Sequence, residues 1–223
     1  MKKVKKIIGL LIIVGLAVAG ARLFQYFQEN KILKEVIVRL EADSRIAEVL
    51  VTGLDYDEKR GNVLTTIKFL EYDTGNNPLE PRYFKFTGNV IQFQSLVIRF
   101  KDAHIRAGDK LKGKSVYLFW KAFMLDGSNT QEYEITEVDA IPEGYKLKTP
   151  VSGDFEKNLW KKFWEYALDP EKAAEMGIKN AQIEAPGTMF VPGMLYTIKI
   201  EHDGGMRIDT TPIPKILKGE KIP

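Results

Sequence analysis

Cysteine is absent from this chain of 223 residues, and histidine occurs only twice. Without cysteine there is no thiolate to bind a metal and no residue for a lipid-modified cysteine anchor. The two histidines, His104 and His202, have no second imidazole near them in the sequence. We therefore expect no metal site and interpret both histidines as surface or loop residues. A chain without free thiols also fits a location outside the cytoplasm.

An excess of charge is also missing from most of the chain. The formal net charge is +3, but four of the 33 lysines and arginines stand within the first six residues. The remaining chain carries 29 basic residues against 30 acidic ones. Because a basic patch is what attracts nucleic acid, this balance predicts no nucleic-acid partner.

Catalytic motifs are scarce as well. None of the five serines stands in a Gly-x-Ser-x-Gly motif. Residues 108–115 (GDKLKGKS) match the nucleotide-binding P-loop pattern, with Lys114 and Ser115 in the positions that bind phosphate and magnesium. That motif must open a helix, whereas residues 116–120 (VYLFW) favour a strand. We interpret the segment as a charged hairpin loop between strands and keep nucleotide binding as an alternative.

Two spaced pairs of residues resemble binding or catalytic sites. Glu132 and Glu134 would project from the same face of a strand, as the paired carboxylates of a hydrolase do. Charges at this spacing are more typical of the solvated face of a sheet. Trp160 and Trp164 have a helical spacing, and we expect them to pack a helix onto a sheet rather than to stack on a sugar. We expect no catalytic residue and no cofactor.

The feature that is present is one uninterrupted apolar segment, residues 7–21, directly after the four lysines. Small residues at 17–21 would suit cleavage of a signal peptide. We favour an uncleaved signal-anchor over residues 1–24, because the helical pattern continues through aromatic residues suited to a membrane interface. The positive charges predict a cytoplasmic N-terminus and a periplasmic or extracellular domain. The predicted anchor residues are Ile7, Leu10, Leu11, Ile12, Ile13, Val14, Leu16 and Val18.

Residues 25–44 follow as a predicted juxtamembrane amphipathic helix. Apolar residues alternate at spacings of three and four, the period of a coiled-coil seam. The heptads are few and the apolar face is wide, so we favour a single helix that packs on its own domain. The residues that would mediate helix association in the alternative case are Gly15, Ala19, Asn30, Leu33, Ile37 and Leu40.

From residue 45 to residue 223 the pattern predicts one β-rich domain with a helical insertion at about 154–177. The expected strands are 45–57, 63–73, 82–87, 90–100, 115–125, 131–138, 195–201 and 206–209. The segment 115–125 is apolar on both faces, which predicts a central strand covered on two sides. Short strands with turn signals between them predict a mostly antiparallel β-sandwich or open barrel.

These features predict a single-pass, membrane-anchored extracytoplasmic protein with a non-catalytic interaction or complex-subunit role in the cell envelope. Its expected partners are the membrane and either another envelope protein or a second copy of the chain. A hydrolase that uses carboxylates is the first alternative. A nucleotide-binding protein that uses residues 108–115 is the second.

Overall fold

Two antiparallel sheets form the body of the protein. The computed structural model describes residues 12–28, 31, 44–58, 61–100, 115–126, 129–146, 153–175, 178–201 and 205–214. The strands are β1 (Ser44–Asp57), β2 (Asn62–Glu71), β3 (Arg82–Phe86), β4 (Val90–Phe100), β5 (Ser115–Asp126), β6 (Asn129–Glu134), β7 (Ile178–Glu184), β8 (Gly187–Met189), β9 (Met194–Glu201) and β10 (Met206–Pro212).

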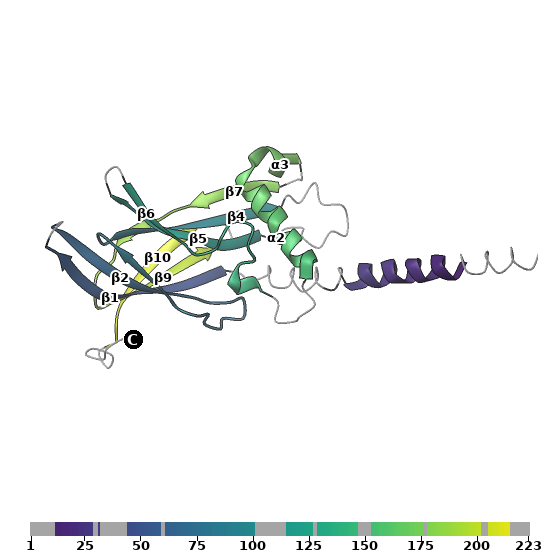
Figure 1. The fold of residues 1–223 in the computed structure, drawn as a ribbon. Coiled ribbons are helices and arrows are strands. Elements are labelled where there is room, and N and C mark those ends of the chain that lie inside the picture. Colours follow the sequence, from purple (N-terminus) through teal and green to yellow (C-terminus); the bar gives the residue numbers. More distant parts are fainter. Residues whose placement is uncertain are drawn as a thin grey trace, which may run out of the picture.

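The first sheet has the order β10-β9-β1-β2-β3, and the second has the order β6-β5-β4-β7, with β8 also paired to β4. The two sheets stack face to face with β3 close to β6, as in a sandwich (Figure 1). Tyr133 on β6 donates its hydroxyl hydrogen to the carbonyl of Lys85 on β3 at 2.6 Å. The mainly antiparallel β architecture predicted from the sequence is therefore confirmed.

An aromatic core fills the space between the sheets. Along β2 every second side chain from Thr65 to Glu71 is buried, as the period of a strand requires. Phe69 lies at the centre of this core, with its ring stacked on Phe93 at 5.5 Å and edge-on to Phe119 at 5.6 Å. Offset and edge-on ring pairs add attraction beyond the apolar area that they bury. We call this group the inter-sheet core.

A second core lies on the outer face of the second sheet. The helix α2 (Gly153–Leu168) and the short helix α3 (Pro170–Glu175) cover this face (Figure 1). Trp160 and Trp164 are almost fully buried there and pack with Leu118 of β5. The expectation that the tryptophans attach a helix to a sheet is confirmed, and so is the doubly covered position of β5. We call this group the helix-side core.

Some element boundaries differ from the prediction. β6 ends at Glu134 rather than at residue 138, because the next two amides, of Ile135 and Thr136, both donate to the carbonyl of Trp120. The strands β7 and β8 were not predicted. Asp169 caps α3 by accepting hydrogen bonds from two backbone amides of the first turn, and Pro170 is the first residue of the helix.

A separate helix covers residues 12–28 (Figure 1). Its large apolar side chains are exposed. Among the residues that the structure describes, no helix is both long enough and apolar enough to span a membrane. Several residues predicted for the anchor or for helix association lie outside the described part of the chain: Ile7, Leu10, Leu11, Asn30, Leu33, Ile37 and Leu40.

Candidate functional site

The P-loop-like segment lies between two antiparallel strands. Residues 101–114 connect β4 to β5 and, like both histidines, fall outside the described residues. Ser115 is the first residue of β5, so a strand stands where the P-loop motif requires a helix. The connection between neighbouring antiparallel strands agrees with the hairpin interpretation of this segment.

Glu132 and Glu134 both lie on β6 and are exposed, as the alternation predicted. Glu132 forms an ion pair with Lys121 of the neighbouring strand at 2.9 Å. Glu134 lies instead beside a cavity and accepts a hydrogen bond on its backbone carbonyl from Arg82 Nη1 at 3.2 Å. The two carboxylates therefore share a strand face but have different surroundings.

Two adjoining cavities of about 460 and 520 Å³ form a concave region among the described residues. Both are lined by Arg82 and Glu143, so we call the combined feature the Arg82 groove. The first cavity is lined by Phe69, Glu71, Leu79, Glu80, Pro81, Arg82 and Glu143. The second is lined by Arg82, Glu134, Ile135, Thr136, Glu137, Asp139, Ala140, Ile141, Glu143, Lys146 and Lys157.

One wall of the Arg82 groove is the connection between β2 and β3. Asp73 organises the turn, because one of its carboxylate oxygens accepts hydrogen bonds from the backbone amides of Gly75 and Asn77, both at 2.8 Å. Asn76 adopts a left-handed φ of 61°, which asparagine tolerates better than most residues. The amide of Leu79 then donates to the carbonyl of Glu71 at 2.8 Å. The chain is thereby returned along the end of β2 and into β3.

The opposite wall is the segment 135–146, which side chains attach to the second sheet and to α2. The hydroxyl of Thr136 donates to the carbonyl of Phe119 at 2.7 Å, and the hydroxyl of Tyr145 donates to the carbonyl of Tyr117 at 2.7 Å. The indole N–H of Trp164 donates to the carbonyl of Ala140 at 2.9 Å. These bonds hold an irregular segment in one position relative to both cores.

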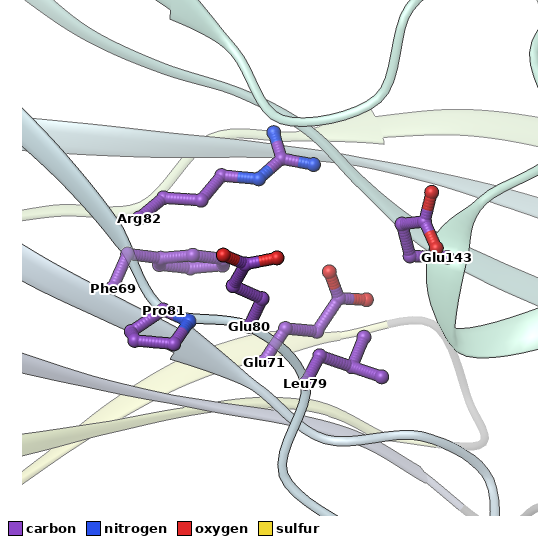
Figure 2. Close-up of a pocket in the computed structure, with 7 residues that line it drawn as sticks. All are labelled: Phe69, Glu71, Leu79, Glu80, Pro81, Arg82 and Glu143. Carbon is purple, nitrogen blue, oxygen red and sulfur yellow. The ribbon is translucent and has the colours of Figure 1, made fainter.

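Charged side chains face the groove from both walls. The guanidinium of Arg82 and the carboxylates of Glu71, Glu80 and Glu143 project towards a common space (Figure 2). Over both cavities, six lining residues are acidic and three are basic. The exposed wall residues can thus accept hydrogen bonds from cationic or amide groups, while Arg82 can donate to a carboxylate or carbonyl. Such a mixed lining suits a polar segment of polypeptide.

Of the residues that line this groove, Glu134 alone is a candidate from the sequence, as one half of the pair Glu132 and Glu134. The expected strands 63–73 and 82–87 leave a connection in the right place, but nothing local indicates that it faces residues 135–146. Within the described ranges, no three histidine or carboxylate side chains gather closely enough to hold a metal ion.

Comparisons of this chain with protein families, with curated proteins and with solved structures found no match.

Proposed function

We propose that this protein is a single-pass, membrane-anchored protein whose β-sandwich lies outside the cytoplasm and binds another envelope protein without catalysing a reaction. The observation that carries the proposal is the exposure of the helix over residues 12–28. Its large apolar side chains are between 50% and 68% exposed. An apolar surface of this kind is stable only if lipid or another apolar surface covers it.

The sequence around this helix supports a bilayer as the covering surface. Residues 7–21 are apolar without interruption, and four lysines precede them. Together with flanking apolar residues, the segment reaches the roughly 20 residues that a spanning helix needs. The lysines favour a cytoplasmic N-terminus, so the sandwich follows on the opposite side of the membrane.

Membrane attachment can be tested on the full-length chain. We expect the protein to remain in the membrane fraction after extraction with alkaline carbonate, since an inserted helix resists this treatment. Release of the full-length protein by carbonate would refute the anchor.

Orientation can be tested with single cysteines, because the natural chain has none. Lys161 is exposed on α2, and a Lys161→Cys variant should react with a membrane-impermeant maleimide in intact bacterial cells. A Lys3→Cys variant is the matched control and should react only after the cells are lysed. The reverse pattern would contradict an extracytoplasmic domain.

The Arg82 groove is the proposed binding surface, because it combines concave shape with donors and acceptors held on two supported walls. A photo-crosslinking residue in place of Glu80 should form a discrete adduct in intact membranes. The adduct should disappear in an Arg82→Ala variant whose melting temperature shows that it is folded. The same photo-crosslinking residue at Lys161 serves as the control. An adduct that persists in the Arg82→Ala variant would exclude the groove as the binding surface.

A hydrolase that uses carboxylates is the second candidate, and one observation favours it. The groove brings Glu134 and Glu143 to one cavity, although they stand on different segments. If this candidate is correct, the purified protein should cleave a member of a panel of ester, glycoside and peptide substrates. Both Glu134→Gln and Glu143→Gln should then reduce the rate at least a hundredfold. Equal rates in the variants would assign the activity to another protein.

A further inference from the structure

The two seams of the sandwich differ in whether the edge strand of the first sheet is covered by side chains of the second sheet. At one seam of the sandwich, the edge of β3 is covered by side chains of β6. Gln131 accepts a hydrogen bond from the amide of Thr87 at 2.9 Å, and Tyr133 donates to the carbonyl of Lys85. At the other seam, the link between the sheets comes from Tyr196 of β9, which is the neighbour of the edge strand β10. Its hydroxyl donates to the carbonyl of Met189, the last residue of β8, at 3.0 Å.

β10 therefore extends the first sheet beyond this link, and its hydrogen-bonding direction can be assigned. Its pairing with β9 keeps a single register from Met206 to Pro212. The amide of Glu201 donates to the carbonyl of Gly205, and the amide of Ile213 donates to the carbonyl of Gly193. Hydrogen-bonded pairs alternate along an antiparallel ladder, so the odd-numbered residues of β10 bond to β9. The amides and carbonyls of Met206, Ile208 and Thr210 point to the outer edge.

The charges on β10 make this outer edge self-complementary. Arg207 and Asp209 lie on the outer face of the sheet and form an ion pair at 3.3 Å. If β10 pairs with its own copy in antiparallel orientation centred on Ile208, Arg207 of each copy lies opposite Asp209 of the other. A shift of the centre by one residue would instead place two arginines or two aspartates opposite each other, which is unfavourable.

We infer that the outer edge of β10 pairs with β10 of a second copy of this chain, about a two-fold axis at Ile208. Met206, Ile208 and Thr210 of the two copies would exchange about six main-chain hydrogen bonds. Ile208, which already packs against the inter-sheet core, would contact its equivalent across the axis. The two first sheets would then form one continuous sheet, and Pro212 would end the pairing because proline has no amide hydrogen.

The geometry agrees with two copies in one membrane. The two-fold axis is perpendicular to the sheets, and Ser44, the first residue of β1, lies two strands away from β10. From strand spacing and rise, the Ser44 residues of the two copies are about 30 Å apart. Both chains can then approach one bilayer from the same face of the pair. An interface of one strand pair is small, so stable pairing depends on the proposed membrane anchor. Confinement of both copies to one membrane raises their effective concentration.

Cysteine crosslinking in cell membranes tests the pairing and its register together. Full-length Arg207→Cys and Asp209→Cys variants are co-expressed with different tags and mildly oxidised. Opposed residues in a non-hydrogen-bonded pair have Cα atoms about 4.5 Å apart, within reach of a disulfide. Two copies of the same variant would place these atoms about 8 Å apart, which is too far. We expect the mixed disulfide to exceed either homodimer at least fivefold.

The control is Tyr83→Cys, which places a cysteine on the outer face of the other edge strand of the same sheet. Mixed and identical pairs that crosslink at equal rates, or no faster than Tyr83→Cys, would overturn the inference.

A Thr210→Pro substitution removes one outward amide and should abolish the mixed disulfide. Its melting temperature checks the fold. If the mixed disulfide does not form but the protein stays in the membrane fraction after carbonate extraction, the strand pairing is rejected and the anchor is retained. If carbonate releases the protein, the anchor itself is rejected.

Discussion

The inter-sheet core and the helix-side core contain similar side chains but leave different polar atoms without partners. Among the residues that the structure describes, the buried atoms between the sheets that lack a hydrogen bond are the hydroxyl oxygens of Thr65 and Ser95. Under and within α2 they are the indole N–H groups of Trp120 and Trp160 and one carboxylate oxygen of Glu156. Desolvating a carboxylate costs more free energy than desolvating a hydroxyl. The inter-sheet core should therefore contribute most of the free energy of unfolding. In α2, replacement of the buried carboxylate should raise that free energy.

The largest effect is expected in the inter-sheet core. A Phe69→Ala substitution removes a ring that contacts three other rings, from β3, β4 and β5. We expect it to lower the free energy of unfolding by about 3–5 kcal/mol, since a buried cavity remains. Urea denaturation followed by tryptophan fluorescence measures this change. A loss below about 1 kcal/mol would mean that the two sheets are not held together by this cluster.

A change of opposite sign is expected at Glu156 in the helix-side core. Its side chain is only 1% exposed, and one carboxylate oxygen lacks a hydrogen bond. A Glu156→Met substitution keeps the length and helix propensity of the side chain and removes the buried carboxyl group. We expect it to raise the free energy of unfolding by about 2 kcal/mol. The exposed neighbour Lys157 provides the control, because Lys157→Met should change stability by less than about 0.5 kcal/mol.

The smallest effect on the free energy of unfolding is expected at Tyr72, whose hydroxyl group has a hydrogen-bond partner. The hydroxyl of Tyr72 donates to Glu48 Oε2 at 2.8 Å. Burial, followed by this hydrogen bond and the charge of Glu48, raises the pKa of Tyr72 to about 12. At neutral pH, Tyr72→Phe should lower the free energy of unfolding by about 1 kcal/mol.

The pH dependence of this difference has a defined direction. The unfolded chain loses the Tyr72 proton near pH 10, whereas the folded protein keeps it until about pH 12. The stabilisation from Tyr72 is therefore complete below pH 10 and is lost as the pH rises towards 12. Denaturation of the natural chain and of Tyr72→Phe at several pH values should show the difference narrowing across this window. A constant difference would contradict the assignment.

Elements with strong local patterns could be predicted from the sequence. The helical insertion expected at about 154–177 contains α2, and the spacing of Trp160 and Trp164 predicted the face that this helix buries. The apolar character of both faces of β5 predicted a strand between two covering layers. Asp169 and Pro170 are residue types typical of a helix start, and α3 begins at Pro170. In each case the free-energy gain comes from burying a face that the local periodicity defines.

Other elements depend on partners distant in the sequence. The strand β7 is short and contains several polar residues, and it is stabilised by pairing with β4, some 80 residues earlier. β6 ends early because Trp120 supplies the carbonyl that accepts two amides. The Arg82 groove exists only because residues 79–82 and 135–146 meet across the seam between the sheets. No local pattern contains these contacts, so single-sequence reasoning could not predict them.

Composition and local pattern are enough to identify the apolar N-terminal segment with its lysines, the near-neutral charge of the remaining chain, and the faces that the strands and α2 bury. These properties follow from composition and from periods of two and 3.6 residues. Long-range contacts determine which strand edges meet, which walls form the Arg82 groove and, within the described part of the chain, that β10 is an edge strand. These features depend on hydrogen bonds and packing between residues far apart in the chain. Local sequence patterns contain no information about the combined free energy of those contacts.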